Sequence, residues 1–175
     1  LTGKLSPPPT AKFVSMLMGN DDERVLLATD AGYGFVAKLS DLHSKNRSGK
    51  TLLSVPEKAN VLPPCLVRDI NTDLLIAISN EGRLLVFALS ELPELAKGKG
   101  NKIMNIPSAR LQAREEYLAS VAVVSKNQQL LVYSGKRHTV LKGSDFDEYR
   151  GERGRRGNKL PRGFQNVDSI EVTDR

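Results

Sequence analysis

Two basic, glycine-containing stretches, KGKGNK at 97–102 and GRRGNK at 154–159, carry the residue types best suited to chemistry with an anion. Glycine lets the backbone approach a phosphate and offer its N–H groups, while Lys and Arg neutralise the negative charge. Asn101 and Asn158 can hydrogen-bond phosphate or sugar oxygens. Three interpretations must be separated: a phosphate-binding loop, a tight turn between strands, and a repeated basic loop facing a long polyanion.

Two nucleotide-binding motifs are only partly present. SGKT at 48–51 resembles the end of a phosphate-binding P-loop, but the glycine required at position 44 is Ser44, and the following LLSV is typical of a strand. GYGFVA at 32–37 resembles a dinucleotide fingerprint, yet a strand follows where a helix is required. A hairpin turn explains these glycines better. We therefore expect no nucleotide site.

The other reactive residue types form no catalytic or metal-binding pattern. His43 and His138 lack metal-ligand spacing, and Cys65 is the single cysteine, which excludes a disulfide framework and a cysteine zinc site. The carboxylate pairs at 21–22 and 115–116 lie in contexts typical of turns or surfaces. No Ser-His-Asp grouping follows from the spacing. We expect no catalytic residue, no metal and no cofactor in this chain.

Composition favours an acidic partner. The chain has 175 residues, with 26 Lys and Arg against 20 Asp and Glu, a net charge of +6 and a pI near 9.5. Aromatic residues make up 5% and Trp is absent, so stacking of bases on aromatic rings is not expected to carry binding. The N-terminal LTGKLSPPPTAK lacks the apolar core of a secretory signal. We expect a soluble, intracellular fragment of a longer protein.

The elements that must position the basic stretches are short strands separated by turn signals, which predicts an all-β domain. Strand-like segments lie at 25–29, 34–39, 74–78, 83–89, 117–124 and 130–133. Helical patterns are confined to 91–97 and 108–116, and the first contains a proline.

A repeat of about 50 residues organises these strands. LSDL at 39–42 and LSEL at 89–92 each follow a strand, a glycine turn and a second strand, and each leads into a basic glycine loop. A weaker third copy ends in GERGRRGNKLP. The period predicts propeller-like blades that stack on one another. We predict units at 19–68, 69–124 and 125–175, with residues 1–18 and 164–175 as edge strands of flanking units.

Stacked units would place their basic loops along one rim, which suits a long, curved polyanion read with little base specificity. A single basic loop is more often a solvated turn, but three loops at the same place in successive units favour a binding role. Six cations lie between 150 and 162 against one carboxylate. The predicted phosphate contacts are Lys45, Arg47, Lys50, Lys97, Lys99, Lys102, Arg153, Arg155, Arg156 and Lys159.

Three stretches, LLATDAGYGFVAKLSDL, ELPELAKGKGNKIMNIPSA and GERGRRGNKL, closely resemble the C-terminal domain of the A subunit (ParC) of bacterial topoisomerase IV. The resemblance covers essentially the whole chain. It implies a β-pinwheel, in which four-stranded blades exchange strands and a basic perimeter binds and bends duplex DNA. It implies about five or six blades in the intact domain, so this chain would hold a partial set of about three.

The resemblance also implies a larger assembly. The parent enzyme would be an ATP- and Mg²⁺-dependent type II topoisomerase that decatenates chromosomes and relaxes supercoils. Its partners would be the remainder of a dimeric A subunit, with the B subunit completing a heterotetramer. The setting would be the bacterial cytoplasm and nucleoid, with peripheral inner-membrane association of the parent enzyme also open. The active-site tyrosine would lie outside this chain, because no tyrosine here matches that motif.

Two alternatives stay open. The gyrase relative wraps DNA with a loop of the type Q-R-R-G-G-K-G, whereas KGKGNK lacks the Gln and the Arg pair, and GRRGNK has Asn158 in place of the second glycine. These departures favour bending over strong wrapping. The second alternative is a propeller that binds proteins through its apolar or acidic surface and leaves the basic loops idle.

Overall fold

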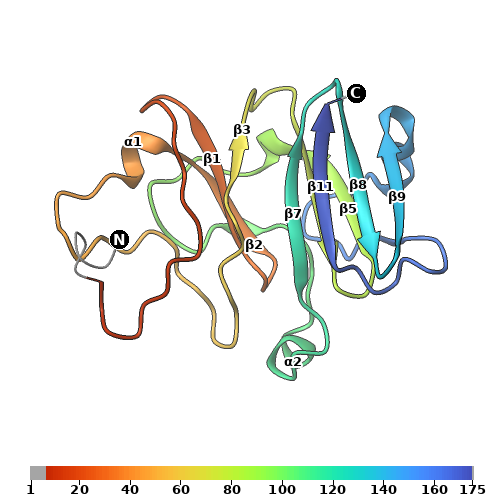
Figure 1. The fold of residues 1–175 in the computed structure, drawn as a ribbon, viewed down its shortest axis with the longest axis horizontal. Helices are drawn as coiled ribbons and strands as arrows, with labels where there is room; N and C mark the ends of the chain where they lie inside the picture. The colour runs from red at the N-terminus through yellow and green to blue at the C-terminus, as the bar shows by residue number, and fades with distance from the viewer. Residues whose placement is uncertain (1–6, 175) are drawn as a thin grey trace.

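The computed structural model describes residues 7–174 and contains three antiparallel sheets that lie side by side (Figure 1). The first sheet has the strand order β3-β1-β2-β6. Its strands are β1 (Arg24–Thr29), β2 (Tyr33–Lys38), β3 (Cys65–Val67) and β6 (Asn101–Lys102). Strands β1 and β2 form a hairpin whose turn contains Gly32 at φ +84°. The expected glycine turn is therefore present.

The second and third sheets repeat this plan. The second sheet has the order β10-β5-β4-β7, and the third has the order β11-β8-β9. The strands of the second sheet are β4 (Leu74–Ser79), β5 (Arg83–Ala88), β7 (Leu118–Val124) and β10 (Asn158–Lys159). The strands of the third sheet are β8 (Gln128–Ser134), β9 (Arg137–Lys142) and β11 (Ser169–Asp174). The predicted all-β pinwheel with three blades is confirmed.

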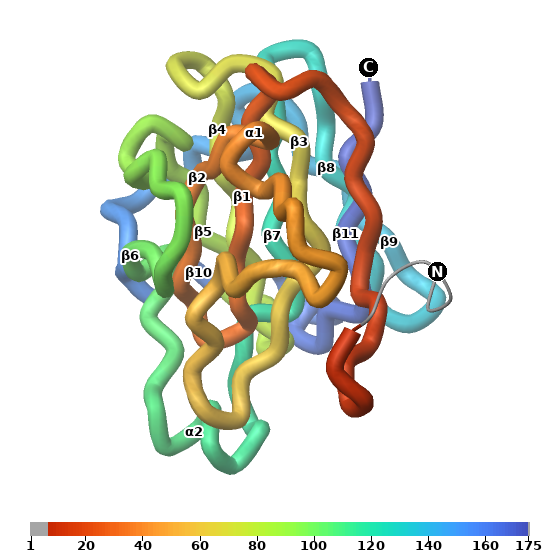
Figure 2. Tube along the Cα trace, turned by 90° about the vertical axis from the view of Figure 1, so that its left-hand side faces the viewer, coloured from red at the N-terminus to blue at the C-terminus, as the bar shows by residue number. Residues whose placement is uncertain are grey.

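Strand exchange places the end of each GNK sequence in the preceding sheet. Strand β6 pairs with β2, with Asn101 opposite Gly34 and Lys102 opposite Tyr33. Strand β10 pairs with β5 in the same register, with Asn158 opposite Leu84. The two GNK sequences are therefore equivalent structural elements, which explains their similarity. Figure 2 shows the segments that carry β6 and β10 on the same side of the molecule.

Short helical turns follow each hairpin, and a further short helix precedes β7. They are α1 (Leu39–Leu42), the 3-10 turns η1 (Leu89–Glu91) and η2 (Gly143–Tyr149), and α2 (Ser108–Gln112). In the Leu-Ser-acid-Leu motifs, the first leucine is buried and its N–H donates to a carbonyl just before the hairpin. Leu39 donates to Glu23 at 2.9 Å, and Leu89 donates to Asp73 at 3.0 Å. The motif therefore anchors the chain where it leaves the sheet.

Two apolar cores lie between neighbouring sheets. Strand β4 directs Leu75 and Ala77 into the core shared with the first sheet, and Ile76 and Ile78 into the core shared with the third. Because both faces of β4 are buried, its residues 74–78 (LLIAI) are all apolar and do not alternate with polar residues. Each fully buried Leu or Ile contributes roughly 1.5–3 kcal/mol to stability. The second sheet can therefore be stable only between two neighbours.

Three sequence predictions were wrong, two about flanking strands and one about a helix. Residues 169–174 are not an edge strand of a flanking unit; they form β11, which pairs with β8 inside the third sheet. Residues 7–20 contain no strand, and residues 1–6 lie outside the described part. The helical pattern at 91–97 yields only the end of η1, because Pro93 follows at once. The unit bounds 19–68, 69–124 and 125–175 stay predictions.

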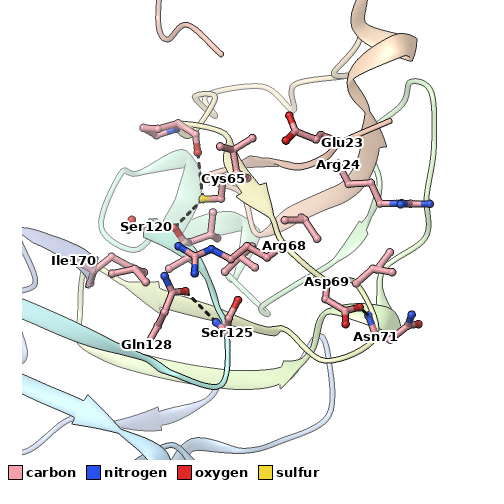
Figure 3. Close-up of a pocket in the computed structure, with 18 of the residues that line it drawn as sticks. Glu23, Arg24, Cys65, Arg68, Asp69, Asn71, Ser120, Ser125, Gln128 and Ile170 are labelled. Carbon is pink, nitrogen blue, oxygen red and sulfur yellow. Dashed lines mark hydrogen bonds between the residues drawn. The ribbon is translucent and has the colours of Figure 1, made fainter. Parts of the chain in front are cut away.

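Strands β3, β7 and β11 border a cleft of about 1030 Å³ (Figure 3). Its lining includes Cys65, Arg68, Gln128 and Ile170, but none of the ten predicted phosphate contacts. Burial raises the pKa of the Cys65 thiol to about 11, so the thiol is protonated at neutral pH, as expected for a small packing residue. Within residues 7–174, no helix is long and apolar enough to cross a membrane.

Candidate nucleic-acid interface

The three basic loops are joined to one another by backbone hydrogen bonds. We call residues 46–51, 97–102 and 154–159 the first, second and third loops. Ser54, just after the first loop, donates its N–H to the Gly98 carbonyl at 2.8 Å. In the same way, Asn105 after the second loop donates to the Arg155 carbonyl at 3.0 Å. The second and third loops thus each lie against the segment that follows the preceding loop, and we call the three loops together the basic track.

The glycines of the GNK sequences serve the fold rather than an anion. Gly100 has φ +77°, and a Cβ there would lie 2.1 Å from the carbonyl oxygen of Gly34. Gly157 has φ +73°, and its Cβ would lie 2.5 Å from the carbonyl oxygen of Leu84. Both positions need glycine because the exchanged strand turns tightly against its neighbour. At these two positions, glycine is required by a tight turn and not by close approach of the backbone to a phosphate.

The first loop presents its cations to solvent. Lys45, Arg47 and Lys50 are all exposed, and no ion pair joins them to a carboxylate among the described residues. At Gly49, which has φ +80°, a Cβ would meet no atom within 4 Å, so the tip of the loop is open. These side chains are therefore available to an anion.

The second loop combines cations with one aromatic ring. Lys97 and Lys99 are exposed, and the Lys99 Nζ lies 4.3 Å from the centre of the Tyr33 ring. The Nζ of half-buried Lys102 lies 5.8 Å from the same ring and 3.4 Å from the Asn105 side-chain oxygen. Sequence reasoning placed Tyr33 only in a hairpin turn. The pairing of β2 with β6 brings Tyr33 next to the second loop.

The third loop and the residue before it hold their arginines in three different ways. Arg153 is half-buried and donates to the Lys102 carbonyl at 2.8 Å. Arg155 is exposed and pairs with Glu152 at 2.9 Å. Arg156 donates to both carboxylate oxygens of Glu116, at 2.6 and 2.7 Å. Lys159 is exposed. The four predicted contacts of this region therefore lie together but are not equivalent.

Sequence reasoning missed two features beside the third loop. Arg150 lines a hollow of about 240 Å³ together with Arg155 and Arg156, and its Nε donates to Asp147 at 2.8 Å. The sequence signal that could have identified Arg150 was its place in the run of six cations between residues 150 and 162. The interpretation of the carboxylates at 115–116 as surface residues was wrong for Glu116, which is fully buried. No sequence signal distinguishes it from exposed Glu115.

The arrangement is suited to electrostatic binding and not to covalent chemistry. Exposed Lys and Arg side chains lie along the basic track, and backbone hydrogen bonds hold its second and third loops to the preceding unit, an arrangement suited to electrostatic contact with an anion. Among residues 7–174, no group of three or more His, Cys, Asp or Glu could hold a metal ion. Charge is therefore the means by which the track can hold a ligand.

Comparison with known proteins agrees with this geometry. The family model described as the DNA gyrase C-terminal domain, a beta-propeller, matches residues 23–62 and 73–125. The chain is 54% identical over 172 residues to the A subunit of DNA topoisomerase 4 from Pseudomonas aeruginosa and 48% identical to that of Escherichia coli. These matches cover 98% of this chain and 23% of each relative, so the chain spans about a quarter of their length.

Solved structures give the same result. The structure of the E. coli ParC C-terminal domain matches with a TM-score of 0.90 and 46% identity, covering 99% of this chain and 70% of that one. A DNA gyrase A C-terminal domain matches with a TM-score of 0.68 and 18% identity, covering 89% and 50%, which shows the shared fold alone. The chain therefore belongs to the family of C-terminal β-propeller domains of topoisomerase IV and gyrase A subunits.

Proposed function

We propose that this chain is a non-catalytic, duplex-DNA-binding module of a type II topoisomerase, which engages and bends the transported DNA segment. The observation that carries the proposal is the set of three basic loops, of which the second and third are each hydrogen-bonded to the segment that follows the preceding loop. Side chains that neutralise phosphates along such a track would bind DNA with little sequence preference.

The remaining parts of the reaction would come from outside this chain. Relatives named as A subunits of DNA topoisomerase 4 support a place in a bacterial topoisomerase assembly, with a dimeric A subunit completed by the B subunit. Cleavage by a tyrosine and the use of ATP and Mg²⁺ would belong to those other regions. The module would contribute to decatenation and relaxation in the nucleoid by holding one duplex in a bent path.

The succession of basic loops along the three sheets supports the bending role. Duplex DNA resists curvature, and smooth bending of 20–30 base pairs by 40–90° costs on the order of 1–6 kcal/mol. Cations at successive positions around the sheets can offset that cost, since each neutralised phosphate releases counterions. Because the second and third loops are hydrogen-bonded to the segment that follows the preceding loop, bound DNA would bend to follow the loops.

The test is fluorescence anisotropy of a labelled duplex with the 175-residue chain across a salt series. We compare the wild type with the double variant Lys97→Gln/Lys99→Gln, which removes two exposed cations of the second loop. The log–log slope of affinity against salt should become shallower by about 1.8, because each phosphate contact contributes about 0.9.

A single-lysine control tests whether loss of any exposed lysine changes the salt slope. Lys126→Gln removes one exposed lysine in the turn between β7 and β8, outside the track, and should leave the slope within about 0.3 of wild type. Salt-independent binding by the wild type would contradict the proposal. Tight binding of a protein partner without DNA binding would favour the alternative of a protein-interaction propeller.

A further inference from the structure

Glu116 is a buried carboxylate at the end of the segment that joins α2 to β7. Its side chain is 1% exposed, and its two oxygens accept hydrogen bonds from two guanidinium groups. Arg110 of α2 donates to Oε2 at 2.9 Å, and Arg156 of the third loop donates to both oxygens. A buried carboxylate needs such partners, because an unpaired charge is strongly disfavoured inside a protein.

The contact joins two repeat units that are distant in sequence. Glu116 and Arg156 are separated by 40 residues, and the third loop reaches the second sheet through β10. A second link lies nearby, since the Nη1 of Arg83 in β5 donates to the Gly157 carbonyl at 3.3 Å. The third loop is therefore held to the second sheet through its backbone and through one arginine side chain.

The cluster extends to the hairpin turn of the second sheet. Arg110 forms a bidentate pair with Glu81 and also lies 3.4 Å from Glu115. The hydrogen bond from Arg110 is the main cause that holds the pKa of Glu81 below its usual value, with further contributions from the Arg110, Lys159 and Arg156 charges. Two arginines thus face three carboxylates, and the positive charge of Arg156 is matched by a buried protein partner.

We propose that Glu116 is a positioning residue for the DNA-binding track, and that Arg156 is its anchor rather than a phosphate contact. This inference rests on the proposed function and deepens it. Arg155, the neighbour of Arg156, is exposed and pairs only with exposed Glu152, so it is the arginine of this pair that meets phosphate. Glu116 contributes to DNA binding although its own charge repels DNA.

Two charge-equivalent substitutions test the proposal because they should act in opposite directions. Glu116→Gln and Glu152→Gln each remove one negative charge near the third loop. Electrostatics alone predicts tighter DNA binding for both. We expect Glu116→Gln to weaken binding by about tenfold, since a charge-assisted hydrogen bond that orders the loop is lost. We expect Glu152→Gln to strengthen binding about twofold, since it releases Arg155 from a surface ion pair.

Substitutions of the arginines separate anchoring from direct contact. Arg156→Gln should lower affinity while the log–log salt slope changes by less than about 0.3, whereas Arg155→Gln should make the slope shallower by about 0.9. Arg156→Lys keeps the charge but loses the planar fork, so it should also lower affinity. It serves as the second variant if Glu116→Gln does not fold, as judged by circular dichroism and thermal unfolding.

The outcomes are distinguishable from failure of the proposed function. If the wild type shows no salt-dependent DNA binding, the proposed function fails. If the wild type binds but Glu116→Gln binds more tightly, the positioning role is overturned and the proposed function stands. A slope change of about 0.9 in Arg156→Gln would show that Arg156 contacts phosphate directly, and full affinity in Arg156→Lys would contradict anchoring through the planar guanidinium fork.

Discussion

Arg155 and Arg156 are neighbours in the chain, yet their surroundings differ. Arg155 is exposed beside Glu152, and Arg156 is bound to a carboxylate that is fully buried. Sequence composition treats the two as equal cations. Their different roles arise because successive side chains of the loop point to different surroundings, one towards solvent and one towards the second sheet. Under the anchoring role proposed for Arg156, a count of cations along the chain overstates the number of phosphate contacts.

A pH dependence follows from the cluster around Glu81. Its pKa is lowered from 4.5 in the folded state, so its contribution to stability is present above the unfolded pKa and is lost as the pH falls through the lower folded value. The difference in melting temperature between wild type and Glu81→Gln should be constant at pH values well above 4.5 and should shrink as the pH falls below 4.5. Calorimetry across this range measures it, and a difference that grows on acidification would contradict the assignment.

At the scale of elements, exchange of a two-residue strand determines where the loops lie. Strands β6 and β10 are too short to be stable by themselves, so their place depends on the turn before them. Gly100 and Gly157 make that turn because their backbones contact the neighbouring sheet without space for a side chain. The same glycines that suggested a phosphate-binding loop are therefore the reason that the basic residues reach the perimeter.

Substitution of one of these glycines should loosen the third loop. Gly157→Ala forces a Cβ against the Leu84 carbonyl at positive φ, which we expect to cost about 2–4 kcal/mol of unfolding free energy. Gly49→Ala is the matched control, since it has positive φ in open space and should cost only about 1 kcal/mol. Urea unfolding compares the two. Equal losses would show that contact with the neighbouring sheet is not what requires glycine at 157.

At the scale of the whole molecule, three stacked sheets provide a short, stiff path. The second sheet is buried on both faces, so the relative placement of the three loops is fixed by two apolar cores as well as by backbone hydrogen bonds. For a path of only three loops, the proposed function predicts bending of a duplex and not wrapping around a full turn.

Topology measurements separate bending from wrapping. Nicked plasmid closed by ligase in the presence of the 175-residue chain should show a topoisomer distribution shifted by well under one linking-number unit per bound chain, because bending alone does not constrain a turn. Gel electrophoresis in chloroquine resolves the distribution. A shift near one unit per bound chain would favour the alternative of a gyrase-like wrapping domain.

The sequence by itself determined the strands, the hairpin turns and the repeat of about 50 residues, because these depend on local preferences and on apolar patterning that recurs along the chain. It also placed three basic loops at equivalent positions. The tertiary structure decided what no local pattern encodes. Exchange put β6 and β10 in the preceding sheets, and β11 pairs with β8 as a strand of the third sheet. Packing between units buried Glu116 and bound it to Arg156 across 40 residues. These contacts depend on which segments meet in space, and only the folded chain brings those segments together.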